Sequence, residues 1–317
     1  MMQCRICNGV HESGKRLVFH ESMYGTHEPF EYYYCPLCES LQIVSLPENL
    51  DSFYQRYYTD HFRPSFKKDR LKKPLLVLRT MGYLSFFGKW MEAAGLYNEV
   101  LHWCRIAGIG RHSSILDVGC GNGSLLYSFY KYGFKNLTGI DPHLKTEFTY
   151  KEICFFRQDI FSMHASFDFI MFNHSFEHIW EQHETLEKAS VLLNKGGTIM
   201  IRIPVLNYAY SVYGKYWAQL DPPRHLYLHS VKSFTHLVRS HHLEIYHAYC
   251  DSTELQFVGS EQNKKGIGLY TSQSYYVDPG RSIFDQRQIR HFKKLAKELN
   301  KKQLGDQMVF FLKKAEK

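Results

Sequence analysis

The segment Asp117-Val-Gly-Cys-Gly-Asn-Gly123 has the residue types and spacing that most clearly indicate chemistry. A turn that runs directly from a strand into a helix needs glycine wherever a Cβ atom would collide, and it aims backbone N–H groups at a bound anion. Nicotinamide-binding domains carry Gly-x-Gly-x-x-Gly at the same point, so a glycine loop alone is ambiguous. Here Ser124 takes the last position of that pattern, glycine stands at 123, and Asp117 precedes the first glycine.

Two further carboxylates follow predicted strands downstream of this loop. Asp141 ends the second strand, 20 residues past Gly121, where a carboxylate accepts hydrogen bonds from both hydroxyls of a ribose. Asp159 follows the third strand, where it is placed to accept a hydrogen bond from an adenine amino group. The alternative for either residue alone is a helix or turn cap. Three carboxylates at matching strand ends favour a binding site for an adenosine-containing cofactor.

The elements that position these residues alternate between strand and helix from Ser114 onward, which predicts an α/β fold with a mostly parallel sheet covered on both faces. A helix with Leu186, Ala189, Leu192 and Leu193 on its buried face is expected to stop at Gly196-Gly197, and another helix is expected near 230–241. The predicted strands are 115–118, 137–141, 153–156, 167–172, 198–203, 244–249 and 307–312.

Over about 114–204 the chain resembles the class I S-adenosylmethionine-dependent methyltransferases. The resemblance rests on Leu116-Asp-Val-Gly-Cys-Gly-Asn-Gly123, Gly139-Ile-Asp141, Gln158-Asp-Ile160, Phe167-Asp-Phe-Ile-Met-Phe-Asn-His-Ser-Phe-Glu-His178 and Leu193-Asn-Lys-Gly-Gly197. It implies a Rossmann-like, seven-stranded, mostly parallel sheet in which 307–312 is the antiparallel strand.

The same resemblance implies how S-adenosylmethionine would be held. Gly119 and Gly121 would pass close to its methionine part, Asp117 would hold its ammonium group through water, Asp141 the ribose and Asp159 the adenine. The remaining cofactor contacts are expected from neighbouring positions, namely Cys120, Asn122, Gly123, Pro142, Ile160 and Asn173.

Three residues are candidates for catalysis. Glu177 and His178 follow the fourth strand at the carboxyl edge of the sheet, where ligands of such folds bind, and His178 is the leading candidate for a general base. His225 lies in Leu220-Asp-Pro-Pro-Arg-His-Leu226, which resembles a Pro-Arg-His-Leu element of bacterial sugar and cell-envelope methyltransferases. The alternative for His178 is an ordinary core or surface histidine. Arg224 has two readings, a structural ion pair within a rigid turn and a bidentate contact with a substrate phosphate.

The pair Glu177-His178 also resembles two metal-assisted families, the ubiquinone-pathway O-methyltransferases and the small-RNA 2′-O-methyltransferases. In the latter a glutamate stands three residues before the pair, where this chain has His174. This departure argues against a bound catalytic metal.

Two Cys-x-x-Cys pairs lie near the start of the chain, Cys4/Cys7 and Cys35/Cys38, separated by 27 residues. Two such pairs can give four thiolates to one tetrahedral zinc ion, which would be structural because no coordination position stays open; the alternative is four free thiols. The arrangement resembles the zinc-binding domain of sugar C-methyltransferases. We therefore expect a zinc knuckle over 1–45, a helical lead-in over 46–110, and a methyltransferase domain over 111–317 with insertions at 205–229 and 253–306.

Composition limits the partners. The net charge of +8 favours anionic partners such as nucleotide-linked substrates, although it also serves solubility. The sequence offers no apolar stretch long enough for a membrane span and no signal peptide, which predicts a cytoplasmic protein. A basic run follows the knuckle, beside Phe62 and Phe66, and is read either as a solvated linker or as a nucleic-acid contact: Arg63, Lys67, Lys68, Arg70, Lys72 and Lys73.

These patterns predict methyl transfer from S-adenosylmethionine to a small or nucleotide-linked acceptor, most plausibly a sugar of an envelope polysaccharide. The alternatives are an RNA-binding zinc-ribbon protein or RNA methyltransferase, and a quinone-type O-methyltransferase. The oligomeric state has no signature in the sequence.

Overall fold

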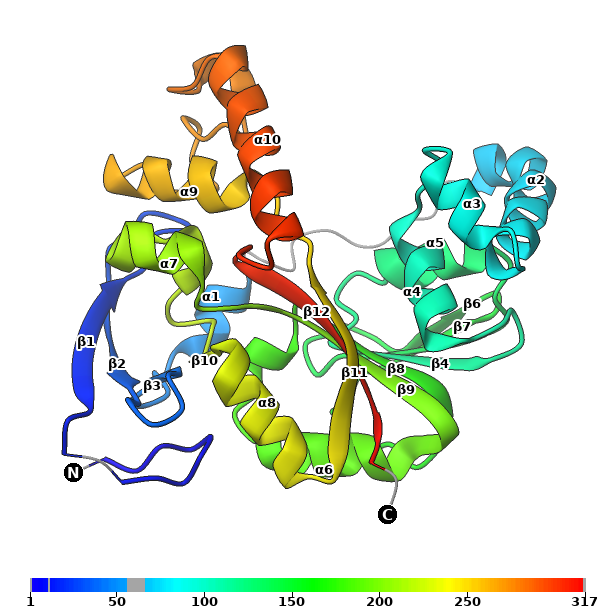
Figure 1. Ribbon diagram of the computed structural model, residues 1–317, viewed down its shortest axis with the longest axis horizontal. Coiled ribbons are helices and arrows are strands. Elements are labelled where there is room, and N and C mark those ends of the chain that lie inside the picture. Colours follow the sequence, from blue (N-terminus) through cyan, green and yellow to red (C-terminus); the bar gives the residue numbers. More distant parts are fainter. Residues whose placement is uncertain (1, 11, 56–65, 316–317) are drawn as a thin grey trace.

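The computed structural model describes residues 2–10, 12–55 and 66–315, and a mixed eight-stranded sheet forms its centre (Figure 1). The strand order is β11-β12-β9-β8-β4-β5-β7-β6, in which β9, β8, β4, β5 and β7 are parallel. The strands are β4 (Ser114–Val118), β5 (Asn136–Ile140), β6 (Phe148–Tyr150), β7 (Ile153–Phe156), β8 (Phe167–Asn173), β9 (Leu193–Pro204), β11 (Leu243–Cys250) and β12 (Gln307–Lys314).

The prediction of seven strands was wrong by one, because β6 pairs with the edge of β7 in an antiparallel hairpin. The ring of Phe148 in β6 stacks on Phe155 in β7 with centroids 4.5 Å apart, which covers that edge. The other seven strands follow the expected arrangement, and β12 runs antiparallel to both β9 and β11. The class I methyltransferase arrangement is thus present with one added edge strand.

Alternation of side chains along β8 supplies two apolar layers, one on each face of the sheet. Ile170 and Phe172 pack in the cluster that contains α6 (Gln182–Leu192) and α8 (Val231–Ser240), whereas Phe169 and Met171 pack in the cluster that contains α4 (Glu99–Ala107) and α5 (Ser124–Lys131). The expectation of a sheet covered on both faces is confirmed. The helix α6 ends earlier than predicted, since β9 begins at Leu193 by pairing with Phe167, and Gly196-Gly197 therefore lie inside that strand.

A smaller four-stranded sheet forms the N-terminal part, in the order β1-β2-β3-β10. Its last strand comes from the segment 205–229, where Tyr227 and Leu228 pair antiparallel with Gln42 and Leu41. The cluster of buried side chains that includes Tyr32 and Leu41 is continuous with the core on one face of the large sheet. The strands are β1 (Lys15–His20), β2 (Pro29–Tyr34), β3 (Leu41–Ile43) and β10 (Tyr227–Leu228).

The remaining helices lie around these two sheets. In Figure 1, α2 and α3 lie beside α4 at one end of the molecule, and α9 and α10 lie near α7 at the other. Among the described residues, no helix is long and apolar enough to cross a membrane. These helices are α1 (Leu50–Gln55), α2 (Phe66–Leu84), α3 (Gly88–Ala93), α7 (Tyr208–Tyr213), α9 (Leu255–Lys264) and α10 (Gln286–Lys301), with short 3-10 turns η1 (Phe176–His178), η2 (Gly214–Tyr216), η3 (Ala218–Leu220) and η4 (Pro279–Arg281).

The predicted basic run extends from residues outside the described part of the chain into α2. Phe62 and Arg63 lie outside the described residues, and for 66–73 only the helical backbone of α2 is described.

Candidate functional site

A cavity of about 780 Å³ opens at the carboxyl ends of β4, β5 and β8. The chain proceeds from β4 outward to β5 and β7 and then returns to β8 on the other side of β4, and such a reversal leaves a crevice between the strand ends where ligands of open α/β sheets bind. Most of the predicted site residues line the cavity: Gly119, Cys120, Gly121, Asn122, Asp141, Pro142, Asp159, Ile160, Asn173 and His178. Asp117, Gly123, Glu177 and His225 lie behind this lining.

The glycine loop joins β4 to α5 and leaves no space for side chains at two of its glycines. Gly119 has φ +74°, and a Cβ atom there would lie 2.5 Å from Cβ of Ser175. Gly123 has φ +76°, and a Cβ atom there would lie 2.5 Å from the ring of Phe155. Both positions thus need glycine for the backbone conformation and for the space, as the sequence pattern predicts.

Asp141 ties the end of β5 to this loop. Its buried carboxylate accepts hydrogen bonds from the backbone N–H of Gly121 at 3.0 Å and of His143 at 2.8 Å. Two charge-assisted bonds of this kind fix the orientation of the carboxylate. The loop and the second strand therefore present their polar groups to the cavity in a fixed geometry.

Asp117 is buried beneath the loop and lies near a second carboxylate. Burial, together with the negative charge of Asp141, raises the pKa of Asp117 to about 7. A cation near this residue would offset both effects and favour the ionised form.

Asp159 and Ile160 form the far wall of the cavity. The carboxylate of Asp159 accepts hydrogen bonds from the backbone N–H and the hydroxyl of Ser162, both at 3.0 Å. The structure therefore shows Asp159 capping a turn, through Oδ1, while the residue also lines the cavity.

Glu177, His178 and His225 come together at the opposite end, although 47 residues separate Glu177-His178 from His225. One potential ligand atom from each lies within 4.8 Å of the other two. Nδ1 of His178 lies 2.7 Å from the carbonyl oxygen of Arg224, and burial lowers the pKa of this imidazole. Since a carbonyl only accepts hydrogen bonds, Nδ1 carries the proton and Nε2 of the neutral ring keeps a lone pair.

The carboxylate of Glu177 is 1% exposed. Burial disfavours its charge, but the imidazoles of His174, His178 and His225 outweigh this effect and lower its pKa to about 2. The nearest recorded contact is 3.5 Å long, from Nδ1 of His174 to Oε1. Glu177 is thus a buried anion surrounded by histidines.

Arg224 has a structural role. Its side chain is fully buried, and the guanidinium donates to the carboxylates of Asp221 and Glu21 and to the carbonyl oxygen of Phe53. Of the two readings of this residue, the ion pair within a turn is the one the structure shows, and the guanidinium is closed off from a substrate phosphate.

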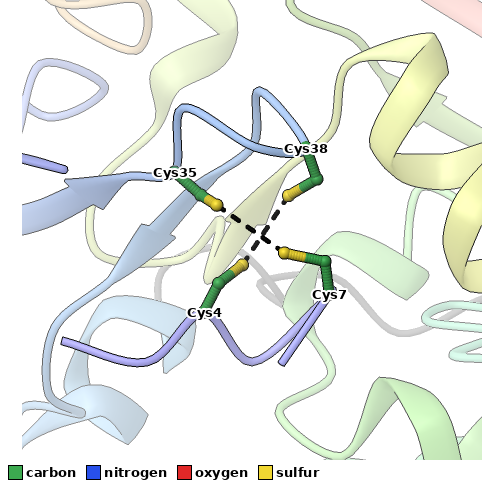
Figure 2. Close-up of side chains that lie close together, drawn as sticks. All are labelled: Cys4, Cys7, Cys35 and Cys38. Carbon is green, nitrogen blue, oxygen red and sulfur yellow. Dashed lines mark hydrogen bonds between the residues drawn. The ribbon is translucent and has the colours of Figure 1, made fainter. Parts of the chain in front are cut away.

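The four cysteines of the two Cys-x-x-Cys pairs converge. Figure 2 shows the four sulfur atoms pointing toward one another, with Cys4 and Cys7 on the N-terminal segment and Cys35 and Cys38 on the turn after β2. The Sγ atoms of Cys4 and Cys38 are 3.7 Å apart, and so are those of Cys7 and Cys35. Four zinc–sulfur bonds of about 2.3 Å in a tetrahedron give sulfur–sulfur edges of about 3.8 Å, so the cluster has the size of a zinc site.

Two pocket residues escaped the sequence analysis. Tyr54, in α1, lies 3.4 Å from Nδ1 of His178 through its hydroxyl and stacks on His143 with centroids 5.1 Å apart. Trp180 lines the cavity and packs under the guanidinium of Arg5, 3.9 Å from the ring centroid. Neither residue belongs to a motif, and both reach the site through tertiary packing that spacing does not encode.

Comparison with known proteins agrees with this geometry. Residues 93–248 match the family described as "Methyltransferase domain". The glycine loop, the carboxylates at the strand ends and the strand order define the class: the chain contains a class I S-adenosylmethionine-dependent methyltransferase domain.

Among curated proteins, a 44-residue segment is 43% identical to EEF1A lysine methyltransferase 2 of Danio rerio, covering 14% of this chain and 19% of that protein. The chain thus spans about a fifth of the length of the curated relatives it matches. Similar solved structures include the mycolic acid cyclopropane synthase CmaA1 with SAH (13% identity, 67% of this chain and 85% of that one, TM-score 0.41) and the magnesium protoporphyrin IX methyltransferase of Synechocystis PCC 6803 with SAH (17%, 65% and 90%, TM-score 0.38).

Proposed function

We propose that this protein transfers the methyl group of S-adenosylmethionine to a small or nucleotide-linked acceptor, such as a sugar of an envelope polysaccharide. The observation that supports this most directly is a single cavity whose lining joins the glycine loop at one end to His178 at the other. Its volume of about 780 Å³ falls within the range of small-molecule sites, roughly 300 to 1,000 Å³.

In this proposal the residues under and around the glycine loop hold the cofactor. Asp117 faces the ammonium group, Gly119, Cys120 and Gly121 pass the methionine part, and Asp141 accepts the ribose hydroxyls. Asp159 and Ile160 hold the adenine, and Asn122, Gly123, Pro142 and Asn173 complete the surroundings. The fixed carboxylate of Asp141 and the close packing at Gly119 support this assignment, because both pre-form a concave polar surface.

Bound S-adenosylmethionine supplies an electrophilic methyl group: the sulfur–carbon bond breaks toward sulfur as the acceptor atom bonds to carbon, and the acceptor loses a proton. What the chain contributes is in-line positioning of the two partners and, for a hydroxyl acceptor, a means of removing the proton. His178, with Glu177 and His225 beside it, lies at the end of the cavity where this is needed. The assignment of His178 as general base stays a prediction.

The acceptor wall supports a polar ring-shaped substrate. Tyr54 and Trp180 provide aromatic surface, and the histidines provide hydrogen-bonding groups. A few polar groups set among aromatic ones are typical of sites that orient small ligands. The net charge of +8 supports an anionic, nucleotide-linked form of that substrate.

We also propose that Cys4, Cys7, Cys35 and Cys38 bind one structural zinc ion. The convergence of the four sulfur atoms supports it, with edges near the length that a ZnS4 tetrahedron requires. Four thiolate ligands would leave the ion without an open position. The ion would therefore stabilise the N-terminal sheet and take no part in the chemistry.

Two experiments test the proposal. Isothermal titration calorimetry with S-adenosylmethionine and S-adenosylhomocysteine should show binding that Asp141→Asn weakens and that Asp278→Asn, a half-exposed surface carboxylate outside the cavity lining, leaves unchanged. Absence of binding to either ligand would sink the methyltransferase proposal.

The acceptor is then sought with methyl-labelled cofactor and a panel of nucleotide sugars, quinols and RNAs. Label on a nucleotide sugar supports the proposal, label on a quinol favours the quinone-type enzyme, and label on RNA favours the RNA enzyme. RNA binding with a steep salt dependence but no transfer would indicate an RNA-binding protein.

A further inference from the structure

Both carboxylate oxygens of Glu177 are buried and lack a hydrogen-bond partner among the described residues. A buried carboxylate without partners costs several kcal/mol, and such groups are normally paired, hydrogen-bonded or bound to a metal. The nearest cationic or polar side-chain atoms stand off at 3.5 Å in His174 and 3.9 Å in His225. These contacts lie within ion-pair distance but are too long for hydrogen bonds, so the hydrogen-bonding capacity of both carboxylate oxygens stays unused.

The two histidines beside Glu177 share one feature. Nδ1 of His178 donates to the carbonyl oxygen of Arg224 at 2.7 Å, and Nδ1 of His225 donates to that of Gln219 at 2.7 Å. Nδ1 of each ring therefore carries a proton, which leaves Nε2 as the nitrogen that could bind a metal ion, and Nε2 of His225 lies 3.9 Å from the carboxylate of Glu177 and 3.7 Å from that of Asp221. Histidines that bind metals usually donate their other ring N–H in this way, because that bond fixes both tautomer and orientation.

We propose that Glu177, His178 and His225 bind a divalent transition-metal ion at the acceptor end of the cavity. Their ligand atoms lie within 4.8 Å of one another. At tetrahedral or octahedral angles, bonds of about 2.1 Å place two ligands of one ion about 3.0–3.4 Å apart, so ligand atoms up to 4.8 Å apart would have to approach by as much as about 1.4–1.8 Å. Two imidazoles and one carboxylate suit Zn²⁺, Fe²⁺, Co²⁺ or Mn²⁺ better than Mg²⁺, which prefers oxygen ligands.

Such an ion would keep open coordination positions, because only three protein ligands hold it. His178 lines the cavity, so these positions face the space where the acceptor would lie. The role of the ion, which rests on the proposed function, would be to bind the oxygen of an acceptor hydroxyl and lower the pKa of that hydroxyl. The hydroxyl would then lose its proton to water. His178 would then be a ligand and would not act as the general base.

Metal analysis of the full-length protein tests the site. The wild type should hold two ions per chain, one at the four cysteines and one at Glu177, and so should the exposed-histidine control His164→Ala. Glu177→Gln and His225→Ala should each keep the ion at the four cysteines and bind the ion at the Glu177 site at least 100-fold more weakly. Cys35→Ser should lose the ion at the cysteines and keep the ion at Glu177. One ion per chain in the wild type, or a second ion that persists in both Glu177→Gln and His225→Ala, would overturn the proposal.

Cobalt spectroscopy on the wild type keeps the proposal testable if these variants fail to fold. With the cysteine site filled by zinc, one further equivalent of Co²⁺ should bind with weak visible absorption and without the intense sulfur-to-cobalt band, and absence of this equivalent contradicts the site. Titration with S-adenosylhomocysteine separates the two proposals. If the protein does not bind S-adenosylhomocysteine, the methyltransferase proposal fails, whereas the number of metal ions per chain still decides whether the metal site exists.

Discussion

Replacing Gly119 by alanine tests whether the loop is shaped by the space around it as well as by backbone conformation. At Gly119 the φ of +74° and the predicted 2.5 Å approach of a new Cβ to Ser175 act together. Gly196 is the matched control, since its φ of +77° is nearly the same and a Cβ atom there would meet nothing within 4 Å.

The two substitutions should differ in magnitude for a calculable reason. An L-residue in the left-handed region costs about 1–2 kcal/mol, which both variants should lose. Gly119→Ala adds overpacking, which typically costs about 1–3 kcal/mol, so its free energy of unfolding should fall by about 2–5 kcal/mol. Relieving the contact requires a shift of nearly 1 Å, which would misplace the N–H of Gly121 that donates to Asp141. Loss of charge-assisted bonds of about 1.5–3 kcal/mol predicts S-adenosylhomocysteine binding weakened roughly ten- to a hundredfold.

Urea unfolding and calorimetric titration measure both effects. Gly196→Ala should lose only the conformational share of stability and keep its cofactor affinity. The double variant Gly119→Ala/Ser175→Gly should recover part of the loss, because it removes the colliding Cβ. If Gly119→Ala is no less stable than Gly196→Ala and binds the cofactor equally well, the reasoning about the loop is refuted.

Three further predictions follow from buried charges and sulfur atoms. The pKa of Asp117 is raised to about 7 in the folded protein from about 3.9 in the unfolded chain, so the free energy of unfolding of the cofactor-free protein should fall as pH rises from 4 through 7. Asp117→Asn should remove this pH dependence in urea titrations. Cofactor affinity should instead rise about tenfold from pH 6 to pH 7.5 in the wild type and stay flat in Asp117→Asn. Arg224→Met leaves Asp221 and Glu21 buried without a cation and should cost about 3–5 kcal/mol in urea unfolding, against less than about 1 kcal/mol for Arg16→Met at the exposed pair with Glu31; equal losses would contradict the buried pair. Cys35→Ser or zinc chelation should lower the melting temperature by several degrees, and an unchanged melting temperature would count against a structural ion. Either change should also raise the KM for the acceptor more than the Kd for S-adenosylhomocysteine.

The large sheet was predictable because its strands are buried on both faces and carry strong local signals. Segments such as Phe167-Asp-Phe-Ile-Met-Phe172 are apolar on both sides, and the glycine loop marks the first crossover. Parallel topology then brings Asp117, Asp141 and Asp159 to one edge, which is why residues distant in sequence were expected together. The two Cys-x-x-Cys pairs converge as expected for a similar reason: their spacing is a local signal.

Other features depend on tertiary contacts without a local signature. The strand β10 has two residues and exists only because Tyr227 and Leu228 pair with β3. The strand β6 has three residues and is held by the stacking of Phe148 on Phe155. Glu177 and His225 were separate candidates in the sequence, and only the path of the loop after β9 shows that they face each other. Charge alone likewise left the role of Arg224 open, and its complete burial decided it.

The N-terminal sheet holds the acceptor end of the cavity and not the cofactor end. Arg5, between Cys4 and Cys7, packs on Trp180 and donates to the hydroxyl of Tyr227, which in turn donates to the carbonyl oxygen of Trp180. On the other side, the hydroxyl of Tyr32 donates to the carbonyl oxygen of His225 at 2.7 Å. Trp180 and His225 are therefore fixed through residues that the cysteine cluster anchors, whereas Asp117, Asp141 and the glycine loop are fixed within the large sheet. This division explains why loss of an ion from the cysteines should act on the acceptor first.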